Sequence, residues 1–428
     1  MRRLHPLVLP ILLTALASSA ALATPRYVVI PLAESQFRHS NSYASAINET
    51  GAIAGSVTSY SSDGDDTPVY GFSLAFPGAR TATILRGPQT NDWEDTYPTG
   101  INAGGQIVGR TSALNNGGPF RAFVANGGVM TDIGSLDGDP NYSTDANAIN
   151  DAGQIVGRSH TVGAFHAFLY SGGVMTDINP HGDTFSTANA INNRGEIAGS
   201  TGNHAFLYSG GVMHQLSALD SSATGMNNHG EIVGTASFQG DNNGHAFLYA
   251  KGKMTDLGTL GGPTSAPAAI NDHGEIVGRS DVKKSNFPRA FFSTGDKMID
   301  LNTLIPASSK WTVLSADSIN DGGLIVGYGT EKGSFRTQAL LIAPVPTLTV
   351  IGGTSRVTHQ ARLTIRGRAD RSVARVTYSR KKNRNFSAHG VAHWHFTPNL
   401  HPGKNVITVV ARGIGGNVTR AHIIITRS

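Results

Sequence analysis

Apolar residues occur in short runs of four to six along the chain, separated by Gly, Asn, Asp and Ser. In one stretch, residues 269–271 (Ala-Ile-Asn) end such a run, residues 272–274 (Asp-His-Gly) are turn formers, and residues 275–279 (Glu-Ile-Val-Gly-Arg) alternate. An Asn side chain can bond its own backbone and Gly tolerates positive φ, so this spacing predicts a tight hairpin. A second hairpin, clearest over residues 166–178, predicts that each unit is a four-stranded meander.

This unit recurs seven times. Its repeated asparagines are Asn48, Asn102, Asn150, Asn192, Asn227, Asn271 and Asn320, which lie 35 to 54 residues apart. Residues 24–345 divided among seven units give 46 residues each, close to the ~40 to 50 residues of a four-stranded propeller blade. A repeat of this length predicts either blades around an axis or the turns of a linear β-solenoid.

The two ends of the repeat region favour the ring over the solenoid. The seventh unit has strands at 318–320, 324–327 and 338–342 before a proline break, so its fourth strand is missing. Residues 27–32 precede the first unit and can supply that strand. A ring closed in this way exposes no sheet edge, whereas a solenoid requires capping units. We therefore predict an all-β fold containing a seven-bladed β-propeller closed by its N-terminal strand.

The first 23 residues differ from the rest of the chain. Arg2 and Arg3 form a charged segment, residues 7–17 are apolar, and residues 21–23 (Ala-Leu-Ala) fit a cleavage site. This pattern predicts a signal peptide over 1–23, with an N-terminal membrane anchor as the alternative. The apolar run is short for a membrane span. We expect an exported protein, extracellular or periplasmic, with no transmembrane segment in its mature form. The chain contains no Cys, which excludes disulfides and thiolate chemistry.

A second module is predicted after the prolines at 344 and 346. Short strands are expected at 348–351, 361–366, 374–378, 393–396, 405–411 and 422–426. This density of strands predicts a small β-sandwich over residues 346–428, next to a propeller over residues 24–345.

Two resemblances carry further expectations. The segments A-I-N-D-H-G-E-I-V-G-R-S (269–280) and H-A-F-L-Y-S-G-G-V-M-T-D (166–177) resemble the HAF-repeat family of bacterial extracellular proteins, over about three quarters of the chain. The first copy departs most, because residues 72–74 read Phe-Ser-Leu instead of His-Ala-Phe. Residues 392–418 resemble the W-x-F, L-x-P-G-x-N-x-I-x-V and G-N-V segments of bacterial immunoglobulin-like domains. The first resemblance implies export without a catalytic motif, and the second implies a spacer or carbohydrate-contacting module.

Charge divides the chain into an acidic and a basic part. Residues 24–345 carry a net charge of −10, whereas residues 346–428 hold 14 Lys or Arg and one acid, a net charge of +13. In the predicted strand 361–366, alternation places Arg362 and Arg366 on one face. This face is either an ordinary solvated surface or a binding surface for anionic polysaccharide, an anionic envelope or the acidic propeller. Nucleic acid is not expected, because no aromatic residues interleave with the charges in an RNP pattern. The predicted binding residues are Arg362, Arg366, Arg368, Arg375, Arg380, Lys381 and Lys382.

Other polar clusters have simpler explanations than a reactive site. His166, His204 and His245 recur in equivalent places, so we expect them to form hydrogen bonds at strand edges and not a shared metal site. The acidic stretch with Asp63, Asp65 and Asp66 could hold Ca²⁺, but it lacks the EF-hand spacing, and a solvated loop explains it. His389, His393 and His395 are a weak metal signal beside Trp394 and Phe396.

No nucleophile elbow, P-loop, H-E-x-x-H or dinucleotide-binding fingerprint occurs. We therefore expect a monomeric, exported, non-catalytic binding or structural protein without a cofactor, which contacts envelope or extracellular polysaccharide or protein. The alternative is a propeller enzyme, a glycosidase or lyase, that degrades polysaccharide at a site over the central channel. A glycosidase would need two carboxyl groups ~5 to 10 Å apart in a sugar cleft.

Overall fold

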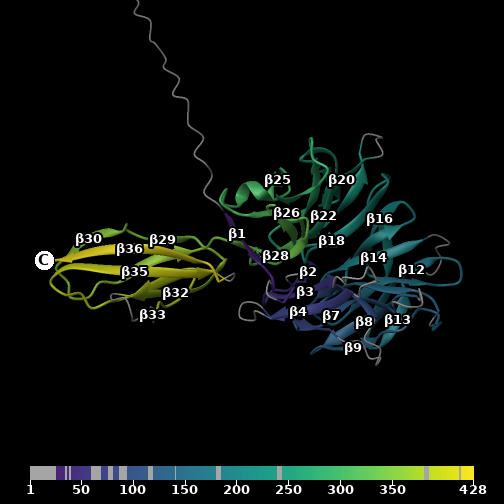
Figure 1. Cartoon of the computed structure of the whole chain (residues 1–428), viewed down its shortest axis with the longest axis horizontal. Coiled ribbons are helices and arrows are strands. Elements are labelled where there is room, and N and C mark those ends of the chain that lie inside the picture. Colours follow the sequence, from purple (N-terminus) through teal and green to yellow (C-terminus); the bar gives the residue numbers. More distant parts are fainter. Residues whose placement is uncertain are drawn as a thin grey trace, which may run out of the picture.

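The computed structural model describes residues 26–33, 36–37, 40–58, 69–75, 81–85, 94–113, 119–139, 141–179, 185–238, 243–379, 385–413 and 416–428. Regular structure in these ranges is β throughout, apart from one short 3-10 helix, η1 (Leu301–Leu304). The described strands form seven four-stranded antiparallel sheets and two sheets near the C-terminus. Figure 1 shows the seven sheets gathered together, with the C-terminal pair of sheets standing beside them.

The first six sheets are meanders, in which strands that are consecutive in the chain pair with each other. Sheet one contains β2 (Asn41–Ile47), β3 (Ala52–Thr58), β4 (Val69–Ala75) and β5 (Thr83–Ile84). Sheet two contains β6 (Glu94–Ile101), β7 (Ile107–Ala113), β8 (Arg121–Asn126) and β9 (Val129–Asp132). Sheet three contains β10 (Thr144–Ile149), β11 (Ile155–His160), β12 (Phe165–Ser171) and β13 (Val174–Asp177).

The next three sheets repeat this arrangement. Sheet four contains β14 (Ser186–Ile191), β15 (Ile197–Thr201), β16 (His204–Ser209) and β17 (Val212–Gln215). Sheet five contains β18 (Ser221–Met226), β19 (Ile232–Ser237), β20 (Gly244–Ala250) and β21 (Lys253–Asp256). Sheet six contains β22 (Gly261–Ile270), β23 (Ile276–Val282), β24 (Arg289–Ser293) and β25 (Ile299–Asp300).

Sheet seven takes strands from both ends of the repeat region. It contains β26 (Trp311–Ile319), β27 (Ile325–Glu331), β28 (Thr337–Pro344) and β1 (Tyr27–Pro31). β1 runs antiparallel to β28, with Val29 opposite Ile342 and Pro31 opposite Leu340. This pairing is the one that the missing fourth strand of the seventh unit predicts.

The repeated asparagines link the seven sheets into a closed ring. Each Asn is at most 5% exposed, and its Nδ2 donates to the backbone carbonyl of the Asn in the next sheet. The bonds run from Asn48 to Asn102, Asn150, Asn192, Asn227, Asn271, Asn320 and back to Asn48, at 2.8 to 3.3 Å. The first strand of every sheet contacts the first strand of the next, and β26 contacts β2. We call the end of the ring that carries these turns the Asn end.

A glycine in the second strand of each sheet permits this geometry. In sheet three, a Cβ added at Gly157 would lie 1.9 Å from the carbonyl oxygen of Asp145 and 3.0 Å from the Phe168 ring. The corresponding glycines of the other sheets would meet a backbone oxygen at 2.0 to 2.2 Å. A β-bulge in the first strand, between Ala146 and Ala148 in sheet three, brings the two backbones this close.

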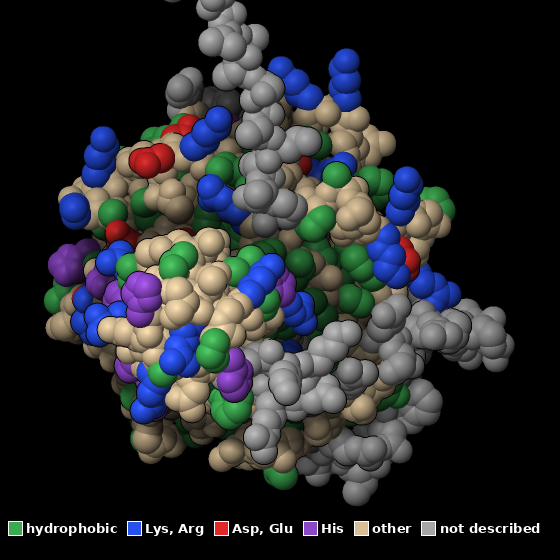
Figure 2. Space-filling model, turned by 90° about the vertical axis from the view of Figure 1, so that its left-hand side faces the viewer, with side chains coloured by type: hydrophobic (Ala, Val, Ile, Leu, Met, Phe, Trp, Pro, Cys, Tyr) green, Lys and Arg blue, Asp and Glu red, His purple; other side chains and the backbone are tan. Residues whose placement is uncertain are grey.

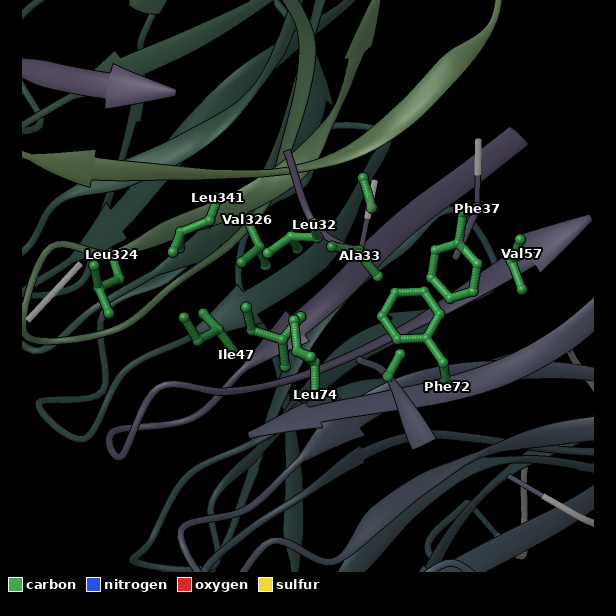
Figure 3. Close-up of a cluster of buried hydrophobic side chains, with 14 of the residues drawn as sticks. Leu32, Ala33, Phe37, Ile47, Val57, Phe72, Leu74, Leu324, Val326 and Leu341 are labelled. Carbon is green, nitrogen blue, oxygen red and sulfur yellow. The ribbon is translucent and has the colours of Figure 1, made fainter. Parts of the chain in front are cut away.

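Apolar side chains fill the seam where the last sheet meets the first (Figure 3). Leu32 follows β1, Leu341 lies on β28, and Phe72 and Leu74 come from β4. All four are at most 4% exposed. Phe37 packs on Phe72 with ring centroids 5.2 Å apart. The ring is therefore closed by buried apolar surface as well as by hydrogen bonds.

The C-terminal region has two sheets with a common apolar core. One sheet has the order β29 (Leu348–Val350), β31 (Ile365–Ala369), β34 (His393–Phe396). The other has the order β30 (Ser355–Thr358), β36 (Val418–Arg427), β35 (Gly403–Gly413), β32 (Val373–Ser379), β33 (Asn385–Ser387). Ile365, Trp394 and Phe396 of the first sheet pack with Val376, Ile407, Val409 and Ile425 of the second. The strand predicted at 361–366 begins later, because β34 offers pairing partners only to residues 365–368.

Polar contacts between described residues join the C-terminal region to the ring. Asn417 Nδ2 donates to the Pro344 carbonyl oxygen at 2.6 Å, and Arg371 forms an ion pair with Glu275 in sheet six. The predicted signal peptide, residues 1–23, lies outside the described residues. No helix in the described ranges is long and apolar enough to cross a membrane.

Candidate functional site

The three-stranded sheet of the C-terminal region carries arginine on its outer face. In β31, Ile365 and Gly367 are buried, whereas Arg366 and Arg368 are exposed. The two-residue period of a strand explains the alternation, because successive side chains point to opposite faces. The two guanidinium groups therefore project from the same side of the sheet into solvent.

Histidines continue this surface on the neighbouring strand. In β34, His393 and His395 are exposed, while Trp394 between them is 1% exposed. Arg366 lies opposite His395, and Arg368 lies opposite His393. We call these four side chains the cationic sheet face. Figure 2, which looks onto this end of the molecule, shows Lys, Arg and His side chains gathered there.

A third histidine extends the surface without forming a metal centre. The rings of His389 and His395 are stacked, with centroids 5.2 Å apart, and their backbones exchange hydrogen bonds of 2.9 and 3.0 Å. The described part of the chain contains no group of three His, Cys, Asp or Glu residues placed to hold a metal ion. Neighbouring arginines also oppose a bound cation.

The inner side of the sheet fixes how this surface is presented. A Cβ on Gly367 would lie 2.0 Å from Cζ2 of Trp394, so only glycine lets the indole lie flat under β31. Phe396 stacks on Tyr378 with ring centroids 3.9 Å apart. Large aromatic side chains thus anchor β34 while its histidines face outward.

The other predicted binding residues do not all join this face. Arg362 is exposed ahead of β31, at an isolated bridge to Asn399. Arg375 lies on the five-stranded sheet, opposite Arg412. Arg380, Lys381 and Lys382 lie outside the described residues, as do Asp63, Asp65 and Asp66. The described members of the predicted set therefore divide between the two sheets.

No carboxylate of this region opposes the cationic sheet face. Asp370 is the one acidic residue in 346–428. Its carboxylate accepts hydrogen bonds from the backbone N–H groups of Thr347 (2.6 Å) and Ser372 (3.0 Å). Its charge is thus used to order a turn, and the positive field of the sheet is left uncompensated by neighbouring acids.

The repeated histidines lie within their own sheets, as expected. His166 Nδ1 is 2.7 Å from Asp177 Oδ2, and His245 Nδ1 is 3.1 Å from Asp256 Oδ2. Each pair joins the third strand of a sheet to the end of the fourth. The predicted strand-edge hydrogen bonding is confirmed for these two residues.

A second polar cluster, not predicted from the sequence, lies toward the ring end opposite the Asn end. Arg110 Nη1 and Arg158 Nε contact the carboxylate of Asp145 at 3.4 and 2.7 Å. The Asp145 side chain is 5% exposed. The two arginines occupy the position directly after the second-strand glycine, which varies among Ser56, Arg110, Arg158, Ser200, Thr235, Arg279 and Tyr328. A variable position inside a strict repeat is the signal that could have identified it.

Comparisons with known proteins return general similarities of fold. No protein-family model and no curated protein matches the chain. A Pyrococcus horikoshii acylaminoacyl peptidase is similar at 8% identity and a TM-score of 0.46, over 79% of this chain and 59% of that one. TolB from Acinetobacter baumannii is similar at 12% identity and a TM-score of 0.38, over 68% of this chain and 79% of that one. The extracellular domain of BT4673 from B. thetaiotaomicron is similar at 9% identity and a TM-score of 0.31, over 94% and 98%. This chain spans about three fifths of the peptidase.

Proposed function

We propose that the protein is an exported, non-catalytic binding protein that holds anionic envelope or extracellular polysaccharide on its cationic sheet face. The observation that carries this proposal is the cross-strand arrangement of Arg366, Arg368, His393 and His395 on one exposed face. A planar guanidinium group matches carboxylate and phosphate groups bidentately. A row of such groups on a flat sheet suits an extended polyanion better than a small enclosed ligand.

We propose further that the ring is a seven-bladed β-propeller. The closed cycle of seven asparagine hydrogen bonds supports this, as does the pairing of β1 with β28. Full closure hides the sheet edges that would otherwise template aggregation. In this proposal the propeller is a rigid support, and its resemblance to HAF-repeat proteins stays a prediction.

We assign the C-terminal region to the immunoglobulin-like class. The two sheets with a single core and the buried Trp394 support this assignment. The Arg371–Glu275 pair joins this basic region to the acidic ring. Export, cleavage after residue 23 and a monomeric state are part of the same proposal.

The test compares two double substitutions in the chain from residue 24 onward. Arg366→Ser with Arg368→Ser removes two charges from the cationic sheet face, whereas Arg412→Ser with Arg420→Ser removes two exposed charges from the five-stranded sheet. We expect the first variant to lose at least about 10-fold in retention on anionic polysaccharide at low salt, and the second to lose less than about 3-fold. Equal losses would mean that net charge alone governs binding and would refute this site.

One observation favours the rival function, a propeller enzyme that degrades polysaccharide. Asp317 lies on the first strand of sheet seven, and burial raises the pKa of its carboxyl group to about 6, within the range of a general acid. The buried Asp145 carboxylate belongs to sheet three and is held by two arginines, so it is not free to act as the second carboxyl group that a glycosidase needs. Shortening of uronic-acid or neutral polysaccharide chains during incubation with the protein would establish the enzyme and overturn the non-catalytic proposal.

A further inference from the structure

The first strands of the ring share a belt of hydrogen bonds three residues before each repeated Asn. In sheets one to five, the side chain at this position donates to a backbone carbonyl of the next sheet. The donors are Ser45 to Pro98, Thr99 to Ala146, Asn147 to Ala188, Asn189 to Ala223 and Thr224 to Pro267, at 2.7 to 2.9 Å. Ala268 occupies the position in sheet six and Asp317 in sheet seven. The repeat therefore requires at most a small neutral donor here.

Asp317 departs from this rule. An ionised carboxylate has no proton to donate to the carbonyl of the next sheet, so the ring gains nothing from it. The Ser315 hydroxyl instead donates to Asp317 Oδ1 at 2.5 Å. The side chain is half-buried, and burial raises the pKa of its carboxyl group to about 6 against the Ser315 hydrogen bond and the Arg279 charge. Burial of the ionised Asp317 side chain is unfavourable, and the other six sheets have no acid at this position. Asp317 therefore has a role other than ring closure.

Arg279 acts on this acid through its charge and differs from the equivalent arginines. Arg110 and Arg158 both pair with Asp145. Arg279 is exposed, and no ion pair of Arg279 occurs among the described residues. Its positive charge acts on the Tyr328 hydroxyl of the next sheet and lowers the pKa of that group.

Two tyrosines complete the group. Tyr328 of sheet seven meets Tyr43 of sheet one edge to face, with ring centroids 5.0 Å apart. Burial and the neighbouring Asp317 carboxylate raise the pKa of Tyr328, while Arg279 acts in the opposite direction. The Tyr328 hydroxyl is therefore a donor throughout the physiological pH range.

A cavity of about 420 Å³, lined by residues of sheets five and six, has Arg279 in its wall and shares this one residue with the group. Hydroxyl groups of Thr235 and Thr264 and the carboxylate of Asp281 line it. Thr264 Oγ1 donates to Asp281 Oδ2 at 2.5 Å. A concave site with Thr and Ser side chains, one guanidinium group and the Asp281 carboxylate suits a ligand whose single negative charge meets Arg279 and whose hydroxyl groups face the remaining polar side chains.

We propose that Arg279, Tyr328, Tyr43 and the adjoining cavity form a second binding site, which takes a uronic-acid unit of an acidic saccharide. The guanidinium group of Arg279 binds the sugar carboxylate, a geometry in which two parallel N–H donors meet two oxygens. The tyrosines offer an apolar ring surface and a hydroxyl to the sugar. This site is independent of the cationic sheet face and does not rest on it.

Asp317 makes the site sensitive to pH. Ser315 donates to the carboxyl group, Arg279 acts on it through its charge, and the Asp317 charge in turn acts on Tyr328. Below its pKa the neutral group can donate a hydrogen bond to an anionic ligand. Above that pKa its charge repels the ligand carboxylate, so binding weakens as the pH rises through about 6.

The experiment measures oligogalacturonate, oligoglucuronate and oligomannuronate binding by calorimetry, with carboxyl-reduced oligogalacturonate as the neutral control. The Arg366→Ser, Arg368→Ser chain serves as the background, so that the cationic sheet face does not contribute. We expect at least one uronate to bind and Arg279→Gln to weaken it about 10-fold or more. The affinity of Arg279→Lys for the same uronate should lie between that of the background protein and that of Arg279→Gln. Lys297→Gln, at an exposed position in the loop between β24 and β25 of sheet six, should change affinity less than about 2-fold.

The pH arm uses Asp317→Asn. The background protein should bind about 3- to 10-fold more weakly at pH 7.5 than at pH 5, and the variant should bind alike at both values. Failure of all three uronates to bind would overturn the proposal. So would equal binding of the reduced chain, or an unchanged affinity in Arg279→Gln. A pH dependence that persists in Asp317→Asn would remove this residue from the site.

Discussion

The two ends of the ring use the same strands in opposite ways. At the Asn end the same residue recurs in every sheet. Its side-chain amide forms hydrogen bonds to its own turn and to the next sheet, as Asn150 does with Gln154 and Asn192. Toward the other end, equivalent positions hold Ser, Thr, Arg, Tyr or Asp. Repeated positions therefore maintain closure, and variable positions are available for recognition. Four substitutions test this division, from the largest expected effect to the smallest.

Gly157→Ala tests the repeated part most severely. The new Cβ would lie 1.9 Å from the Asp145 carbonyl oxygen, and neither backbone can move without opening the bulge. We expect a loss of at least ~3 to 5 kcal/mol in the free energy of unfolding, measured by urea denaturation. The matched control is Gly244→Ala, where the nearest atom would be 3.8 Å away. A small effect at Gly157 would contradict the claim that this close approach is obligatory.

Asn150→Ala tests one link of the asparagine ring. The change leaves the carbonyl of Asn192 and the N–H groups of Ala152 and Gln154 without their buried partner. We expect unfolding to become easier by ~2 to 4 kcal/mol. Asn193→Ala, at an exposed neighbouring position of the same turn motif, should cost less than ~1 kcal/mol. Equal costs at the two positions would show that the ring of hydrogen bonds has no special weight.

Asp145→Asn tests the variable end, where a buried acid serves structure as well as local charge. It leaves the Arg110 and Arg158 guanidinium groups without the carboxylate that lies between them. We expect a loss of ~1 to 3 kcal/mol by thermal or urea unfolding, below the cost of a fully buried broken pair because both arginines are partly exposed. Asp132→Asn, whose Arg121 partner is half exposed, should cost under ~1 kcal/mol. A larger loss of stability in Asp132→Asn than in Asp145→Asn would contradict this account of the Asp145 site.

Asp317→Asn should change the free energy of unfolding least, and it should raise this free energy where the other three substitutions lower it. Because folding raises the pKa of Asp317 from an ordinary acidic value to about 6, the folded state holds this proton more tightly than the unfolded chain. The wild-type protein therefore loses stability as the pH rises from about 4 to 6. A shift of about two pKa units corresponds to ~3 kcal/mol, which the partial exposure of the side chain reduces. We expect the variant to be more stable by of the order of 1 kcal/mol at pH 7.5 and equal to wild type near pH 4. A variant less stable at pH 7.5 would show that the acid is structural.

The sequence predicted what a repeat can show by its own regularity. The hairpin turns at Asn48 and its equivalents were readable because Asn and Gly have local reasons to stand there. The pairing of β1 with β28 could be predicted because the seventh unit lacks a fourth strand and residues 27–32 form a strand outside any unit. In the C-terminal region, the strand at 393–396 was predicted with its observed bounds, whereas β30 (Ser355–Thr358), which is short and exposed at its edge, was missed.

Contacts between sheets were not readable from the sequence. Asp145 meets Arg110 from 35 residues away, and the charge of Arg279 acts on Tyr328 of the next sheet. These encounters depend on how far each sheet is rotated from its neighbour, which no local pattern encodes. The basic residues were predicted as one set, but the turn between β31 and β32 carries Arg375 to the other sheet.

The pairing of β1 with β28 also sets an order of events during synthesis. β1 leaves the ribosome first, yet its partner, Thr337–Pro344, is made only after six other sheets have been completed. Until then the nascent chain carries an apolar strand with no neighbour to hydrogen-bond, which is a hazard for association between chains. The last sheet can form only when both ends of the repeat region are present, so its assembly is the step that converts a row of hairpin units into a single cooperative body.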